Sequence, residues 1–311
     1  MTSLKLFLAP DYWRHMFSWQ RAVTAVLAGL GTLYSVVEVS GFFSTAAEAA
    51  FKQNWAAFLG AGLLYALWDN WPQTAVSSRL DGRDVVVEIR IGNIFSMQGD
   101  MVIGSNTTFE TELAPNTISE RSIQGQFTTR YYDRHEHMAN ELQEQLAGMP
   151  CVEVTRAGKN VKKYRMGTVA KIRPRNQTAY LIAIADLNDH GNASSSFSVL
   201  LECLPALWEH VSTQGGVGPI LIPVLGTGFS RLPNQREEII RNIVGSFVAA
   251  CASKRFCERL TIVISPSDYR TFGIDLQKLG RFVEHICMYT PFSSPQSVGA
   301  GQPVPATRQV A

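Results

Sequence analysis

The two longest apolar runs of this chain lie near its N-terminus, and they limit the folds open to it. The first run, residues 22–43, has 22 residues and one charged side chain, Glu38. At 1.5 Å per residue it could cross the roughly 30 Å hydrocarbon core of a bilayer. The second run, residues 55–68, would form about 21 Å of helix, which is short for a span. We predict a two-helix transmembrane hairpin over residues 22–71, with an interfacial or buried second helix as the alternative.

Basic residues around the two runs predict the orientation of the hairpin. Three lie within residues 1–21 and three within residues 69–90, whereas the connector 44–54 contains only Lys52. Because cytoplasmic loops carry an excess of Lys and Arg, both ends of the hairpin are expected in the cytoplasm. We therefore predict a multi-pass protein of the inner (plasma) membrane, with a cytoplasmic N-terminal segment over residues 1–21. The lipid bilayer is its expected partner.

Small residues recur at four-residue spacing in both runs, as in Ala25 with Gly29 and Ala56 with Gly60. Such positions let helices approach closely in lipid, and this favours packing of several hairpins. Ordinary transmembrane composition, which is rich in Gly and Ala, explains the same pattern. Glu38 is costly in hydrocarbon unless it reaches the headgroups from its place near the end of the run.

From residue 84 onward the pattern is that of a soluble α/β domain. Strands are predicted over 85–95, 101–106, 178–188, 219–232 with its glycine loop, and 259–266. Helices are predicted over 131–148, 195–216 despite Pro205, 236–254 and 273–288. Alternating strands and helices predict a three-layer α/β/α fold with a mixed sheet over residues 84–290. Residues 291–311, rich in Pro, Ser, Gly and Gln, are predicted to be a disordered tail.

Composition and motifs exclude several classes of function. A net charge of +2 is too small to favour nucleic-acid binding. Five scattered cysteines form no CxxC pair, and His135 and His137 lie two residues apart, so no metal site is predicted. The chain contains neither GxxxxGK[ST] nor GxSxG. We therefore expect no catalytic residues and no cofactor.

Two glycine- and serine-containing loops follow predicted buried strands. Gly226, Thr227 and Gly228 come directly after ILIPVL, and Gly104 to Thr108 form GSNTT after MVI. Ligands of open α/β sheets bind at the carboxyl ends of strands, where backbone N–H groups can hold a phosphate. Each loop alone is equally well explained as a tight turn. Together they favour a phosphate-bearing ligand.

The order of GNI (92–94), VIGSNTTF (102–109), IAIADLN (182–188) and IPVLGTGFSR (222–231) resembles a macrodomain, the ADP-ribose-binding fold. The resemblance implies a pocket that holds adenine, ribose and diphosphate. Asn93 stands where the family usually has an adenine-reading Asp, and the first loop departs from the V-N-A-A-N pattern. These departures favour binding over hydrolysis. The implied pocket residues are Asn93, Ser105, Asn106, Thr107, Gly226, Thr227, Gly228, Phe229 and Arg231.

A macrodomain behind a membrane hairpin is similar to the effectors of type II Thoeris anti-phage defence. The resemblance implies a messenger of the histidine-ADP-ribose type, made by a partner TIR-domain protein. It also implies homo-oligomerisation on activation, membrane disruption and abortive infection. Two alternatives stay open at this point. One is a membrane-tethered ADP-ribosyl or ADP-ribose-phosphate hydrolase, and the other is a passive tether for ADP-ribosylated proteins.

Overall fold

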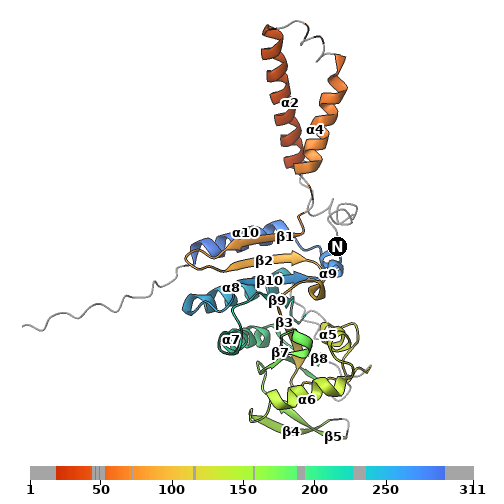
Figure 1. Cartoon of the computed structure of the whole chain (residues 1–311), viewed down its shortest axis with the longest axis vertical. Helices are drawn as coiled ribbons and strands as arrows, with labels where there is room; N and C mark the ends of the chain where they lie inside the picture. Colours follow the sequence, from red (N-terminus) through yellow and green to blue (C-terminus); the bar gives the residue numbers. More distant parts are fainter. Residues whose placement is uncertain are drawn as a thin grey trace, which may run out of the picture.

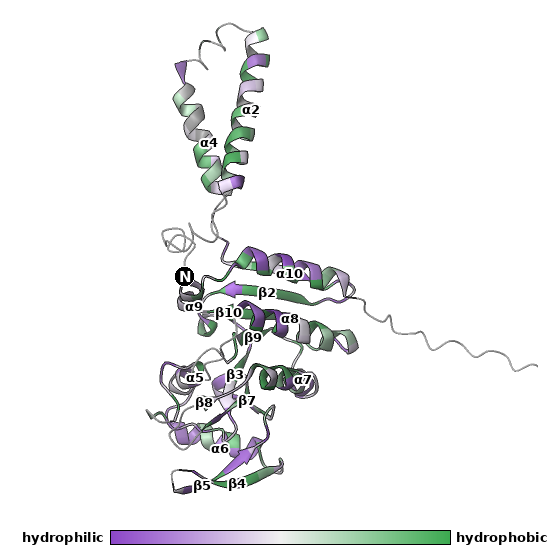
Figure 2. Ribbon diagram, turned by 180° about the vertical axis from the view of Figure 1, so that it is seen from behind, coloured by the Kyte–Doolittle hydropathy of each residue, from purple (hydrophilic) through white to green (hydrophobic). Residues whose placement is uncertain are grey.

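The computed structural model describes residues 19–43, 46, 49, 53–69, 71, 73–114, 117–156, 158–187, 193–226 and 236–290. Two helices, α2 (Trp19–Phe43) and α4 (Trp55–Asp69), pack against each other and stand apart from the sheet in Figures 1 and 2. The predicted N-terminal segment before Trp19 and the predicted tail 291–311 lie outside the described residues.

The contact between α2 and α4 is made by small residues. Ala22, Ala25 and Ala66 are buried, whereas large apolar side chains such as Leu27 and Trp68 are exposed. Among the described residues, one helix is long and apolar enough to cross a bilayer, over residues 22–39. A signal sequence satisfies the same criteria. Only 12% of that window is buried, which differs from the core helix of a soluble protein.

The main sheet has the strand order β1-β2-β10-β9-β3-β7-β6, with β8 paired to β7. Its strands are β1 (Ala75–Arg79), β2 (Val86–Ile91), β3 (Asp100–Asn106), β6 (Val169–Ile172), β7 (Ala179–Leu187), β8 (Ala193–Ser194), β9 (Ile220–Pro223) and β10 (Arg259–Ile264). Strands β2, β10, β9, β3 and β7 run parallel. Strands β1, β6 and β8 pair antiparallel to their neighbours, so the predicted mixed sheet is confirmed.

Helices cover both faces of the sheet (Figure 1). One layer contains α7 (Phe197–Gln214), α8 (Arg236–Ser253) and α10 (Leu276–Tyr289). The other contains the 3-10 helix η2 (Ile94–Ser96), α5 (Ile123–Tyr131) and α6 (His135–Gln145). Two short elements complete the topology: α9 (Pro266–Phe272) follows β10, and η3 (Pro174–Asn176) precedes β7. The three-layer α/β/α arrangement agrees with the prediction.

The central strand β7 shows why this sequence folds between two layers. Tyr180 and Ile182 point into the core beneath α7 and α8, whereas Leu181 and Ala183 point into the core beneath α5 and α6. Because both faces of the strand are buried, AYLIAIADL is apolar almost throughout and does not alternate with polar residues.

The sheet begins earlier than the residue-84 boundary predicted from sequence. Strand β1 starts at Ala75 and pairs along its length with β2. A separate two-stranded sheet, β4 (Cys151–Arg156) with β5 (Lys159–Tyr164), also lacked a prediction. The predicted strand 85–95 is shorter, because Asn93 caps η2 immediately after β2 ends. The predicted helix 131–148 is α6, which begins at His135.

Candidate functional site: a cleft at the carboxyl ends of the parallel strands

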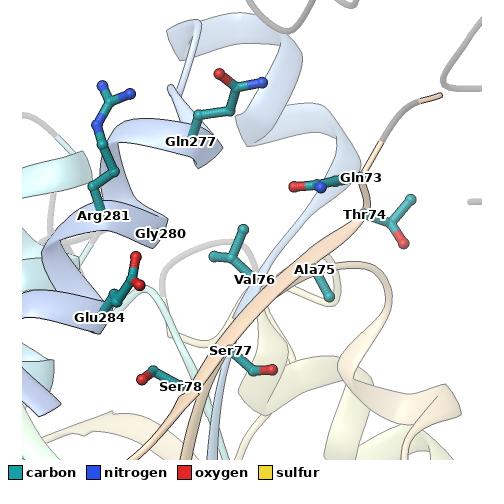
Figure 3. Close-up of a pocket in the computed structure, with 10 residues that line it drawn as sticks. All are labelled: Gln73, Thr74, Ala75, Val76, Ser77, Ser78, Gln277, Gly280, Arg281 and Glu284. Carbon is teal, nitrogen blue, oxygen red and sulfur yellow. The ribbon is translucent and has the colours of Figure 1, made fainter. Parts of the chain in front are cut away.

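A cleft of about 390 Å³ opens at the carboxyl ends of β3, β7, β9 and β10. This is the edge at which open α/β sheets bind ligands. The loop before α5 and the first turn of that helix form its outer wall, with Ser119, Arg121, Ser122 and Gln124 among the lining residues. A larger cavity of about 740 Å³ lies elsewhere, between β1 and α10 (Figure 3).

At the floor of the cleft, the side chain of Ile184 in β7 lies against Gly104 in β3. A Cβ atom on Gly104 would lie 2.7 Å from Cδ1 of Ile184, so a side chain here would displace that wall. The next residue, Ser105, is 5% exposed, and its Oγ has no hydrogen-bond partner within the described part of the chain. A buried hydroxyl without a partner costs free energy. A ligand that reaches this hydroxyl would supply the hydrogen bond that the described residues do not.

Asn106 also lines the cleft, but its carboxamide oxygen is already engaged. That oxygen accepts hydrogen bonds from Thr108 N at 3.0 Å, Thr108 Oγ1 at 2.8 Å and Glu110 N at 3.2 Å. The carboxamide therefore holds the loop after β3 in shape. Its NH2 group is the part left for a ligand.

Thr107 is not in the described lining of the cleft, and its contacts are structural. Its hydroxyl donates a hydrogen bond to the carboxylate of Asp186, which also accepts one from Lys163 Nζ at 2.9 Å. Its backbone N–H donates to Ala185 O at 2.9 Å. Thr107 therefore ties the loop to the end of β7.

Gly226 lines the cleft at the end of β9 and has φ +72°, in the left-handed region that favours glycine. The other residues predicted in this loop, Thr227, Gly228, Phe229 and Arg231, lie outside the described residues. Of the predicted loop residues, the structure describes only Gly226, which lines the cleft.

Asn93 does not join this group. Its side chain is exposed, and Oδ1 accepts a hydrogen bond from Phe95 N at 3.0 Å. That bond caps η2, and Asn93 is absent from the described lining of the cleft. The described lining of the cleft therefore contains Ser105, Asn106 and Gly226, and Asn93 is not part of it.

Two lining segments were missed by sequence reasoning. Ser122 caps α5 by accepting from Gly125 N at 2.9 Å, and Ser265 caps α9 by accepting from Asp268 N at 3.0 Å. The second has the spacing S-x-x-D, a known signal for a helix start. Burial raises the pKa of Asp268, while the charge of Arg236 and the Ser265 hydrogen bond oppose that rise.

The cleft has the chemistry of an anion-binding site. The N-terminus of α5 carries a partial positive charge and borders the cleft, next to the guanidinium-bearing Arg121. Arg121 and Asp268 are the ionisable residues among its described lining, which includes no His, Cys or Lys. The described lining thus provides hydroxyls, backbone N–H groups, the Arg121 guanidinium and the Asp268 carboxyl group, but no nucleophile with a neighbouring base.

A mixed sheet between two helical layers, with a ligand cleft at the carboxyl ends of its parallel strands, is the arrangement of a macrodomain. The model of the family described as "Thoeris protein ThsA, Macro domain" matches residues 87–265, more than half of the chain. The chain therefore belongs to the ThsA macro domain family.

Individual relatives are more distant. The Thoeris protein ThsA of Bacillus amyloliquefaciens (strain Y2) is 22% identical over 218 residues, which cover 67% of this chain and 70% of that protein. The Oceanobacillus iheyensis macrodomain with MES bound is 13% identical with a TM-score of 0.47, over 68% of this chain and 97% of that one. The Trypanosoma brucei macrodomain in complex with ADP-ribose is 9% identical with a TM-score of 0.41, over 67% and 73%.

Proposed function

We propose that this chain is a membrane effector of Thoeris anti-phage defence whose macrodomain binds an ADP-ribose-derived messenger. The messenger, of the histidine-ADP-ribose type, is made by a partner TIR-domain protein. Binding drives homo-oligomerisation, disruption of the inner membrane and abortive infection. The chain itself performs no catalysis in this proposal.

The observation that carries the ligand class is the composition of the cleft. The first turn of α5 and Gly226 present backbone groups suited to a diphosphate. Ser105 offers an unused hydroxyl for the ligand's polar atoms. Membership of the ThsA macro domain family supports an ADP-ribose derivative as the phosphate-bearing compound.

The exposed surface of the helical hairpin supports a membrane-bound form. Large apolar side chains face outward on both helices, including Leu27, Tyr34, Leu64 and Trp68. In water this surface would be an aggregation hazard, whereas in lipid it would be satisfied. Because α4 has 15 residues, it would have to sit in a locally thinned bilayer or lie with its ends at the headgroups.

Calorimetry of the full chain in detergent tests the proposal. We expect histidine-conjugated ADP-ribose to bind, with ADP-ribose or NAD binding more weakly. Chromatography of the recovered ligand should show it intact. Release of free ADP-ribose or of its phosphate would contradict the absence of catalysis and favour the hydrolase.

A pair of matched substitutions tests the cleft. Gly226→Glu adds bulk and a negative charge beside the proposed diphosphate, and we expect binding to be lost. Gly148→Glu introduces the same side chain at another left-handed glycine, where a Cβ meets nothing within 4 Å. It should suffer a similar conformational strain but bind normally. Equal affinities in the two folded variants would overturn the assignment of the cleft.

A further inference from the structure

The loop that follows β3 carries backbone strain next to the cleft. Phe109 has φ +49°, in the left-handed region that a bulky side chain rarely adopts. Its ring is nonetheless buried and meets the Tyr164 ring edge-on, with the two centroids 5.7 Å apart. A strained residue persists only where the surrounding structure holds it. The contacts that hold this loop in place therefore bear on the shape of the cleft.

Glu110 connects two lining residues of the cleft through its backbone. Its N–H donates a hydrogen bond to Asn106 Oδ1 at 3.2 Å, and its carbonyl oxygen accepts one from Gln124 Nε2 at 2.6 Å. Asn106 lines the cleft at the end of β3 and Gln124 lines its outer wall, and both are buried. Glu110 itself is not in the described lining. A shift of Glu110 would therefore move two residues that face the ligand.

The side chain of Glu110 is held from outside the cleft, by the β4–β5 pair. Arg156 Nη1 lies 3.2 Å from Glu110 Oε1, and the two side chains are only 10% and 24% exposed. Salt screens an ion pair this far from water only weakly, and removing one partner leaves a poorly solvated charge. Loss of Arg156 would therefore favour movement of the Glu110 side chain towards water, and its backbone would follow.

The β4–β5 pair forms a two-stranded sheet of its own, apart from the main sheet. Figure 1 shows it at the end of the molecule away from the hairpin, beside α6. Most of its side chains are exposed, including the apolar side chain of Val152. Because these strands bury little apolar surface, their position depends largely on polar contacts.

Other polar contacts would keep the β4–β5 pair attached if the Arg156 ion pair were lost. Tyr164 N donates a hydrogen bond to Thr107 O at 2.8 Å. Lys163 Nζ donates to Asp186 Oδ2 at 2.9 Å, at the end of β7. Neither contact involves the residue that connects the two sides of the cleft. A substitution at Arg156 should therefore loosen one end of the loop without detaching the strands.

We propose that Arg156 is a positioning residue of the ligand cleft. It holds Glu110, and through Glu110 it sets where Asn106 and Gln124 stand, without touching the ligand itself. The β4–β5 pair then helps to set the affinity of a site that lies outside it. The effect on affinity rests on the proposed function, whereas the effect on the loop does not. The structural alternative is an ion pair that only stabilises the fold.

Amide exchange of the ligand-free full chain in detergent tests the effect on the loop. The N–H groups of Thr108 and Glu110 both donate to Asn106 Oδ1. We expect Arg156→Met to speed their exchange about tenfold, because the loop opens more often, and to leave the amides of β10 unchanged. Lys162→Met removes the same charge from the opposite, exposed face of the β4–β5 pair and should change neither. Unchanged loop exchange in Arg156→Met would overturn the proposal. So would an equal increase in β10, because the ion pair would then only stabilise the fold.

Calorimetry with histidine-conjugated ADP-ribose tests the effect on affinity. We expect Arg156→Met to weaken binding about tenfold, as is typical of residues coupled in one network, and Arg156→Lys, which keeps the charge, to recover part of the loss. In a Glu110→Gln background, Arg156→Met should weaken binding little further, because the ion pair is already broken.

Additive losses in the double variant would overturn a role that acts through Glu110. Normal affinity of Arg156→Met despite a loosened loop would also overturn the proposal. If the unsubstituted chain binds neither this compound nor ADP-ribose, the proposed function fails, and the exchange measurement alone then decides whether Arg156 positions the loop.

Discussion

Ser105 and Ser122 are both hydroxyl-bearing residues of the cleft, but their chemical situations are opposite. The hydroxyl of Ser122 caps α5, whereas that of Ser105 is buried without a described partner. A residue that is poorly satisfied in the empty protein and faces a cleft is a natural contact for a ligand. The two serines can therefore be told apart by stability and affinity measured on the same variants.

We expect Ser105→Ala to leave the free energy of unfolding unchanged or raise it by up to about 1 kcal/mol, because an unsatisfied hydroxyl is removed. Its affinity for the messenger should fall about three- to tenfold, as expected for one lost hydrogen bond. Ser122→Ala should instead lower the free energy of unfolding by about 1 kcal/mol, because a helix cap is lost. Denaturant unfolding measures the free energy of unfolding, and calorimetry measures the affinity for the messenger. Unchanged affinity in Ser105→Ala would remove Ser105 from the ligand site.

The cysteines allow a second prediction at this scale. Burial raises the pKa of Cys203 and Cys287 to about 11 and that of Cys257 to about 12, and it also raises that of Cys251. Thiolates are the reactive form, so these four thiols should be inert near neutral pH. Cys151, exposed at the start of β4, should react with a maleimide. Mass spectrometry should find one label per native chain and five after denaturation. A second label on the native chain would show that the core opens.

At the scale of elements, the long apolar segments were predictable and the short polar ones were not. The segments that became α7, α8, β7 and β10 carry enough apolar residues to show their type, and the structure confirms them. Strand β1, AVSSR, carries too few apolar residues to show that it is a strand. An edge strand buries little surface, and its strand conformation depends on pairing with β2. The same reason hides the β4–β5 pair, whose residues are mostly exposed.

Some residues of the candidate site were likewise predictable from the sequence, and others were not. Loops after buried strands are visible in sequence, and Ser105, Asn106 and Gly226 line the cleft where those loops place them. The wall from α5 was not visible, because its position depends on how residues far apart in the chain pack. Asn93 is not in the described lining, and its side chain caps η2, so its part in ligand binding stays a prediction.

Gly60 in α4 allows a test at this scale. A Cβ added there meets nothing within 4 Å, so Gly60→Leu should not disturb the packing of α4 on α2. In lipid, close contact between hairpins depends on small residues. We therefore expect Gly60→Leu to leave messenger affinity unchanged but to reduce membrane damage and the mass of the assembled protein. Ala66→Leu, at a position buried between the two helices, should destabilise the hairpin itself. Full toxicity from Gly60→Leu would argue against assembly through this face.

For the whole molecule, the proposed function assigns messenger binding to the macrodomain and membrane damage to the hairpin. Deleting residues 1–71 removes both apolar helices but keeps β1, and the product should bind the messenger with unchanged affinity. It should be extracted from membranes by carbonate and should not kill cells that contain the messenger-producing partner. Toxicity from this truncated chain would rule out action through the hairpin.

Deleting residues 1–83 is the matched control, since it also removes β1. It should lower the free energy of unfolding, because the packing of Val76 on Gly280 is lost and the edge of β2 is uncovered. Equal stability of the two truncated chains would show that β1 adds nothing to the fold.

Because β2 pairs with β10, the central sheet cannot be completed until β10 has been synthesised. Glu88 on β2 and Thr261 on β10 contact each other across 173 residues of chain. At about 5–20 residues per second, the ribosome needs roughly 10–35 seconds to make the segment between them. The hairpin ends at Asp69, so it leaves the ribosome early in that interval, well before β10 is made. In the proposed function, the hairpin could therefore enter the membrane while the macrodomain still lacks β10, so that a nascent chain would be anchored before it could sense its ligand.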